Sequence, residues 1–188
     1  ETQGRAILKV IGVGGCGCNA INRMISSNLA GVEYVAINTD VQALEKCLAD
    51  TRVQVGPRLT GGLGAGGVTE VGEQAAEESL QEIEEAVKGS HMVFVAAGMG
   101  GGTGTGAAPI VARVARDVGA ITVGVITRPF EFEGAPRAAK AEDGVEMLRS
   151  EVDTLIVIPN DRLKALADPD ARMTEVFDMA NMVLMNAV

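Results

Sequence analysis

Short apolar runs recur along the chain and predict the strands of a β-sheet. The runs are nearly continuous and do not alternate with polar residues, which is typical of strands buried on both faces of a parallel sheet. Valine, isoleucine and alanine dominate them. We expect strands at residues 7–11, 32–38, 52–55, 92–97, 121–126 and 154–158.

Amphipathic stretches lie between these runs and predict helices. In residues 69–88 apolar side chains recur on one helical face, and glutamates cover the remainder. Another helix is expected to begin near Thr105, with Pro109 in its first turn, where proline is tolerated. Further helices are expected around residues 21–29 and at residues 135–148, 160–166 and 173–188. This alternation predicts a doubly wound, Rossmann-like α/β fold with a mainly parallel sheet and helices on both faces.

Glycine-rich segments follow three of the predicted strands. They are GVGGCGCN at residues 12–19, TGGLGAGG at 60–67 and GMGGGTGTG at 98–106. In open parallel sheets, ligands bind outside the carboxyl ends of the strands, so the three segments are expected to meet at one edge. A single segment of this kind is an ordinary tight turn, whereas three that converge indicate a ligand site.

The segment at residues 98–106 has the properties of a phosphate-binding loop. Glycines permit positive φ, so successive backbone N–H groups can point into one concavity and approach an anion closely. Thr103 and Thr105 add hydroxyl groups, and the following helix directs its positive N-terminus to the same point. The sequence lacks the G-x-x-x-x-G-K-[ST] motif, which excludes a Walker P-loop.

A dinucleotide-binding enzyme is the main alternative. The segment GVGGCG at residues 12–17 fits the G-x-G-x-x-G fingerprint between a strand and a helix. That fingerprint requires an acidic residue at the end of the second strand to bind the ribose. Asn38 stands at this place, with Asp40 two residues later, and no obvious acid or base for hydride transfer is present. The sequence therefore disfavours NAD.

Composition narrows the classes of partner. The net charge of −9, with no tryptophan and one tyrosine, disfavours nucleic acid. The cysteines Cys16, Cys18 and Cys47 lack the paired spacing of a disulfide scaffold or zinc knuckle, which favours a reducing cytosol. His91 is the single histidine, and no metal site is expected. The sequence contains neither a signal-peptide pattern nor an apolar run long enough to span a membrane.

The run GGGTGTG at residues 100–106 resembles the signature loop of the tubulin/FtsZ family, in the form carried by its bacterial cell-division GTPases. Other segments that fit are GGCGCN at 14–19, NTD at 38–40, GLGAGG at 62–67, PFEFEG at 129–134 and IPND at 158–161. The resemblance covers essentially the whole chain. It implies GTP or GDP with Mg²⁺, head-to-tail polymerisation into protofilaments, and a cytoplasmic ring at the division site. It further implies cell-division proteins as partners and no direct membrane insertion.

The resemblance also implies a set of nucleotide-binding residues. Residues 15–19 and 102–105 are expected at the phosphates, with Ala65 and Gly66 sensing the γ-phosphate. Glu133 and Arg137 are expected at the ribose and the phosphate side. The guanine is expected to be surrounded by Asn19, Asn160 and Phe177, with Asn181 hydrogen-bonding its edge. The complete set is Gly15, Cys16, Gly17, Cys18, Asn19, Ala65, Gly66, Gly102, Thr103, Gly104, Thr105, Glu133, Arg137, Asn160, Phe177 and Asn181.

The sequence departs from the family pattern in two places. Cys16 and Cys18 stand where the family usually has small residues, mostly glycine, so their backbones are expected in ordinary regions of φ and ψ. Asn181 occupies a position that is aspartate in some members. Because an amide divides its donor and its acceptor, discrimination of the base is expected to be weaker here.

The last predicted helix is apolar and stops at Val188 without a glycine cap or a basic last turn. We therefore expect residues 1–188 to be one GTP-binding domain, a fragment truncated in or just after the central helix. In the family, acidic residues beyond this helix orient the attacking water for the nucleotide of a neighbouring subunit. No catalytic residue is thus expected in this chain, which should bind GTP and GDP but hydrolyse GTP very slowly. A structural module in which GTP is mainly an assembly ligand is an open alternative.

Overall fold

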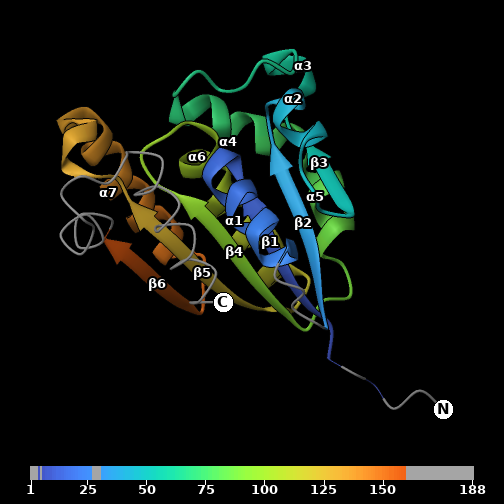
Figure 1. The fold of residues 1–188 in the computed structure, drawn as a ribbon. Helices are drawn as coiled ribbons and strands as arrows, with labels where there is room; N and C mark the ends of the chain where they lie inside the picture. The colour runs from blue at the N-terminus through green and yellow to red at the C-terminus, as the bar shows by residue number, and fades with distance from the viewer. Residues whose placement is uncertain (1–3, 5, 27–30, 160–188) are drawn as a thin grey trace.

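The computed structural model describes residues 4, 6–26 and 31–159, which form a parallel sheet between layers of helices (Figure 1). The strands of these residues are β1 (Leu8–Val13), β2 (Val32–Asn38), β3 (Thr51–Gln54), β4 (Met92–Gly98), β5 (Ile121–Arg128) and β6 (Thr154–Pro159). Their order is β3-β2-β1-β4-β5-β6, and each neighbouring pair is parallel. The doubly wound α/β fold is confirmed, and each predicted strand is present with small shifts of its bounds.

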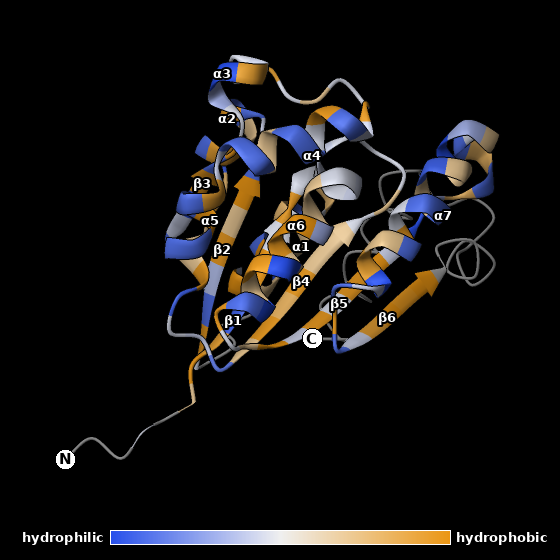
Figure 2. Cartoon of the chain, turned by 180° about the vertical axis from the view of Figure 1, so that it is seen from behind, coloured by the Kyte–Doolittle hydropathy of each residue, from blue (hydrophilic) through white to orange (hydrophobic). Residues whose placement is uncertain are grey.

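The central strand β1 explains why the apolar runs are continuous. It pairs with β2 on one side and with β4 on the other. Ile11 and Val13 pack on the face covered by α4–α7, whereas Val10 packs on the opposite face. All three side chains are at most 1% exposed, so both faces of the strand require apolar residues. Figure 2 shows this apolar character along the strands.

Helices cover both faces of the sheet. They are α1 (Gly14–Ser26), α2 (Val41–Glu45), α3 (Pro57–Thr60), α4 (Thr69–Glu78), α5 (Leu80–Val87), α6 (Thr103–Asp117) and α7 (Ala135–Arg149), with a 3-10 turn η1 (Glu131–Glu133). Ile21 and Met24 of α1 join Leu44 of α2 in the core on the Val10 face. Helices α4, α5, α6 and α7 contribute to the larger core on the other face. The predicted helices at residues 160–166 and 173–188 lie outside the described residues.

The single helix predicted over residues 69–88 is wrong, because Ser79 divides it into α4 and α5. At Ser79 the backbone leaves helical geometry, with φ −114° and ψ 30°. The buried Ser79 hydroxyl accepts a hydrogen bond from the Gly56 N–H at 3.0 Å. Next to it, the Glu78 carboxylate accepts the N–H groups of Arg58 and Leu59, each at 3.1 Å. The break therefore fastens α4 to the start of α3, a tertiary contact that helical periodicity does not report.

The two short helices α2 and α3 were not predicted. Asp40 is the N-cap of α2, and its carboxylate accepts the N–H groups of Gln42 at 3.0 Å and Ala43 at 3.2 Å. Helix α3 has Pro57 in its first turn and ends at Gly61, whose φ of +62° suits glycine. Both helices are too short to produce an amphipathic pattern, so only their capping residues mark them.

Candidate functional site

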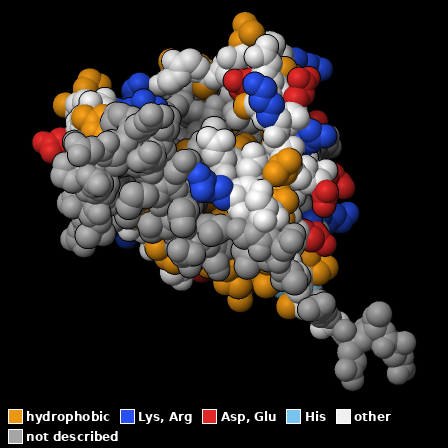
Figure 3. All heavy atoms as spheres, in the orientation of Figure 1, with side chains coloured by type: hydrophobic (Ala, Val, Ile, Leu, Met, Phe, Trp, Pro, Cys, Tyr) orange, Lys and Arg blue, Asp and Glu red, His pale blue; other side chains and the backbone are white. Residues whose placement is uncertain are grey.

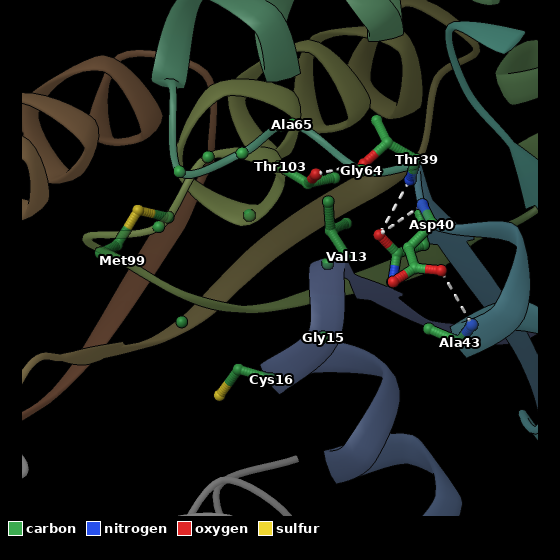
Figure 4. Close-up of a pocket in the computed structure, with 18 of the residues that line it drawn as sticks. Val13, Gly15, Cys16, Thr39, Asp40, Ala43, Gly64, Ala65, Met99 and Thr103 are labelled. Carbon is green, nitrogen blue, oxygen red and sulfur yellow. Dashed lines mark hydrogen bonds between the residues drawn. The ribbon is translucent and has the colours of Figure 1, made fainter. Parts of the chain in front are cut away.

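A cavity of about 560 Å³ opens at the carboxyl edge of the sheet, where β1, β2, β4 and β5 end. It is lined from the start of α1, the turn after β2, the loop before α4, the turn before α6, and the segment before α7. Figure 4 shows Gly15, Thr39, Ala65 and Thr103 around this hollow. In Figure 3 the surface over α1 is mostly white, from backbone and uncharged polar atoms. The three glycine-rich segments therefore meet at one site, as the sequence predicted.

The first glycine-rich segment is the start of helix α1. Gly14 has a φ of +74°, and a Cβ on it would lie 2.9 Å from the Gly104 nitrogen of α6. Gly17 abuts β4, since a Cβ there would overlap the Ala96 carbonyl oxygen. Cys16 and Cys18 have helical backbones, which confirms the ordinary φ and ψ expected for them. The first N–H groups of a helix lack partners within the helix, so α1 presents donors and a positive dipole end to the cavity.

The signature segment begins helix α6 earlier than predicted. The helix starts at Thr103, and the residue before it, Gly102, provides no side-chain cap. Pro109 therefore lies inside the helix, and the prediction that it falls in the first turn is wrong. Gly104 and Gly106 are therefore helical, and in residues 98–106 only Gly100 has a positive φ, of +108°. Gly104 and Gly106 serve close packing instead. A Cβ on Gly104 would lie 2.8 Å from the Gly98 oxygen, and one on Gly106 would lie 2.6 Å from the Glu73 nitrogen of α4.

Two helix N-termini consequently converge on one cavity. The contact between Gly14 and Gly104 joins the start of α1 to the start of α6. Each N-terminus carries roughly half a positive charge, and each has N–H groups available to a ligand. Gly15, Gly102 and Gly104 line the cavity without side chains that would keep a ligand away. This arrangement suits an anion with several oxygen atoms, such as a phosphate chain.

The turn after β2 supplies hydroxyl and capping groups (Figure 4). Thr39 Oγ1 lies 2.6 Å from Thr103 Oγ1, and this hydrogen bond joins the turn after β2 to the start of α6. The Asn38 side chain accepts the N–H groups of Thr39 at 2.8 Å and Asp40 at 3.3 Å. Asn38 is buried, and Asp40 caps α2. At the position where a dinucleotide fold has its ribose-binding acid, the polar groups therefore hydrogen-bond within the turn. This argues against the dinucleotide alternative, although the strand order is that of a classical dinucleotide fold.

The thiol of Cys16 faces the cavity as a neutral group. Burial raises the pKa of this thiol, and the negative charge of Glu133 raises it further, while a hydrogen bond with Thr127 opposes the shift. Cys16 Sγ lies 4.0 Å from Thr127 Oγ1. Because the pKa is raised above the ordinary value of a thiol, Cys16 stays protonated at neutral pH and adds no negative charge beside an anion.

The model of the tubulin/FtsZ family, GTPase domain, matches residues 7–168. The chain belongs to the tubulin/FtsZ family. A solved FtsZ of M. jannaschii, an empty dimer, is 46% identical with a TM-score of 0.95, over 99% of this chain and 54% of the FtsZ chain. This tubulin/FtsZ chain thus spans about half the length of that FtsZ.

More distant members of the tubulin/FtsZ family share the fold. CetZ1 from Haloferax volcanii, a GDP-bound monomer, is 27% identical with a TM-score of 0.85, over 96% of this chain and 58% of CetZ1. CetZ2 from the same organism, a GTPγS-bound protofilament, is 27% identical with a TM-score of 0.86, over 96% of this chain and 56% of CetZ2. Both are structures with a guanine nucleotide or its analogue.

In this tubulin/FtsZ domain most of the expected residues meet at the cavity. Those that line it are Gly15, Cys16, Asn19, Ala65, Gly66, Gly102, Thr103, Gly104, Glu133 and Arg137. Gly17, Cys18 and Thr105 do not line it: Gly17 packs on β4, the Cys18 thiol lies in the core, and the Thr105 hydroxyl accepts the Gly100 N–H at 2.8 Å. Asn160, Phe177 and Asn181 lie outside the described residues.

Glu133 and Arg137 form the wall of the cavity next to α7. One Glu133 oxygen accepts the Phe130 N–H at 2.6 Å, and the other lies 3.6 Å from Arg137 Nη1. The Glu133 side chain is 14% exposed, whereas that of Arg137 is 51% exposed. The carboxylate is therefore fixed by the backbone, and the guanidinium can turn toward a ligand.

The sequence reasoning did not select Thr39, which lines the cavity beside Thr103. The signal was present in the polar run Asn-Thr-Asp that ends β2, where buried parallel strands usually stay apolar. Among the described residues, no group of three or more His, Cys, Asp and Glu could hold a metal ion. None of the described helices is long and apolar enough to cross a membrane.

Proposed function

We propose that the cavity binds GTP and GDP, with the phosphates at the N-termini of α1 and α6. The observation that carries this proposal is the convergence of these two helix starts at Gly14 and Gly104 in one cavity. The GDP-bound and GTPγS-bound structures of the CetZ relatives support guanine as the base. Of the expected phosphate contacts, the backbone of Gly15 and Cys16 and that of residues 102–104 line the cavity and contact the phosphates, and Ala65 and Gly66 adjoin the γ-phosphate.

The remaining contacts are assigned by the family resemblance. Glu133 and Arg137 contact the ribose and the phosphate side, from a wall of the same cavity. Asn19, Asn160 and Phe177 surround the guanine. Asn181 hydrogen-bonds the guanine edge, and loss of this bond in Asn181→Ala weakens GTP binding.

Mg²⁺ bound together with the nucleotide would neutralise part of the charge of the phosphates. Mg²⁺ usually keeps several waters and needs few protein ligands when phosphate oxygens are present, which fits a cavity whose described walls hold no acidic cluster. Asp40 lines the cavity and uses Oδ1 to cap α2. Its carboxylate is the group placed to accept a hydrogen bond from a water of the ion.

Hydrolysis is proposed to depend on a second subunit. In the described lining of the cavity the acidic residues are Asp40, which caps α2 through Oδ1, and Glu133, which accepts the Phe130 N–H. The family resemblance assigns the water-orienting acid to a neighbouring subunit in a head-to-tail protofilament, and the CetZ2 protofilament supports such assembly. The whole protein then acts with cell-division partners in a cytoplasmic ring at the division site.

The experiment measures nucleotide binding and phosphate release by the 188-residue chain at increasing concentrations. The expected result is saturable binding of GDP and GTP, with a very slow turnover per chain that does not rise with concentration. Turnover that rises steeply with concentration contradicts the assignment of the missing acid to residues outside this chain. Absence of guanine-nucleotide binding contradicts the proposed function itself.

A further inference from the structure

The loop at residues 61–67 has little rigidity of its own. Five of its seven residues have positive φ, namely Gly61, Gly62, Gly64, Gly66 and Gly67. Glycine loses more conformational freedom on folding than any other residue, so ordering such a loop is costly. Contacts with neighbouring elements must therefore fix the part of this loop that lines the cavity.

The first half of the loop is anchored to the turn after β2. The Val41 N–H donates to the Gly62 oxygen at 3.1 Å, and Leu63 pairs with Asp40 in an isolated antiparallel bridge. The second half begins at Ala65, which is buried, and the Val68 N–H donates to the Ala65 oxygen at 3.1 Å. The first half of the loop is thus held by a distant segment of the chain, whereas the contact between Ala65 and Val68 is local to the loop.

Lys140 of α7 holds the second half from across the cavity mouth. Its Nζ donates to the Gly67 oxygen at 2.8 Å, a contact between residues 73 positions apart. Arg137 lies three residues earlier, so both side chains share one side of the helix. A Cβ on Gly101 would lie 3.8 Å from Arg137 Nη2. The start of α7 therefore reaches two of the three glycine-rich segments, Arg137 the signature turn and Lys140 the loop before α4.

We propose that Lys140 is a positioning residue for the terminal phosphate of a nucleoside triphosphate. By holding the Gly67 oxygen, it keeps the backbone of Ala65 and Gly66 against the cavity that both residues line. This inference rests on the proposed function. Because a diphosphate lacks the phosphate that this loop adjoins, loss of the contact weakens triphosphate binding more than diphosphate binding.

The test compares Lys140→Met with Lys140→Arg, which keeps a charged donor. Lys88→Met is the matched control, because Lys88 is an exposed lysine that does not line the cavity and its loss changes the net charge equally. Affinities for GDP and for a non-hydrolysable GTP analogue are measured by calorimetry. We expect Lys140→Met to lower the affinity for the analogue about fivefold, as for loss of one hydrogen bond, and the affinity for GDP less than twofold. Lys140→Arg restores the ratio, and Lys88→Met leaves it unchanged.

Hydrogen exchange of residues 61–68 without nucleotide supplies the second readout. Faster exchange in Lys140→Met supports a contact that orders the loop before the ligand arrives, whereas unchanged exchange overturns it. Equal weakening of GDP and the analogue, or no weakening of either, also overturns the proposal. If the unmodified chain binds neither nucleotide, the proposed function fails together with this inference. If it binds both and the ratio does not respond, the inference alone fails.

Discussion

Two threonines at the start of α6 hold the cavity from different sides. The Thr103 hydroxyl bonds that of Thr39, and the Thr105 hydroxyl accepts the Gly100 N–H. Thr105 is fully buried, and its methyl group lies against Gly144 of α7, where a Cβ would be 2.5 Å from Thr105 Cγ2. Thr105 thus supports the turn at Gly100 from beneath, while Thr103 lines the cavity.

Thr105→Val tests the hydroxyl of Thr105 while keeping its methyl group. The substitution leaves the buried Gly100 N–H without its acceptor, so the free energy of unfolding is expected to fall by about 1–3 kcal/mol. Thr105→Ser is the matched control, because it retains the hydroxyl. Its free energy of unfolding should fall by less than about 1.5 kcal/mol. Urea unfolding measures both. If Thr105→Val is as stable as the unmodified chain, or if Thr105→Ser is as unstable as Thr105→Val, the Thr105 hydroxyl does not support the turn at Gly100.

At the scale of elements, glycines perform two separate tasks at the helix starts. Gly106 allows α4 and α6 to pack closely. Gly15 of α1 instead lines the cavity, and a Cβ added to it would have no heavy atom within 4 Å. The first task concerns packing between helices, and the second leaves room for a ligand. Substitutions to alanine should therefore separate stability from binding.

Gly106→Ala places a methyl group against the backbone of Thr69 and Glu73, and is expected to cost about 1–3 kcal/mol of stability. Gly15→Ala fits the helix and is expected to leave stability unchanged or raise it by up to about 1 kcal/mol. Because the new methyl group would occupy space that the phosphates need, the affinity for GDP should fall about tenfold or more. Denaturant unfolding and GDP titration of each variant test this. Loss of stability in Gly15→Ala, or GDP binding at full affinity, contradicts the division of tasks.

The pattern of apolar residues along the chain was enough to predict the strands of this fold, but it did not predict features that depend on single contacts. The six strands follow from continuous apolar runs because burial on both faces requires them. The break at Ser79 depends on a hydrogen bond with Gly56, far away in sequence, so the pattern of residues 69–88 did not reveal it. In the site, the glycine segments predicted the converging loops. The packing roles of Gly104 and Gly106 depend on neighbours that a single sequence does not name.

For the whole molecule, the net charge and the charge of the proposed ligand have the same sign. The chain carries a net charge of −9, and the proposed ligand is a polyanion. Arg137 is the basic residue that lines the cavity in the described part of the chain. Attraction therefore has to come mainly from backbone N–H groups and helix dipoles, which hold an anion without net positive charge.

Thermal unfolding with GDP and with NAD, at equal concentrations and with Mg²⁺ present, tests whether the cavity holds a guanine nucleotide or a dinucleotide. Both ligands carry a diphosphate, and both alternatives use the same edge of the sheet. We predict that GDP at about 100 times its dissociation constant stabilises the chain by roughly 2.7 kcal/mol, which raises Tm by roughly 5–10 °C, while NAD leaves Tm unchanged. A rise in Tm with NAD that equals or exceeds the rise with GDP would contradict the assignment of this cavity to a guanine nucleotide.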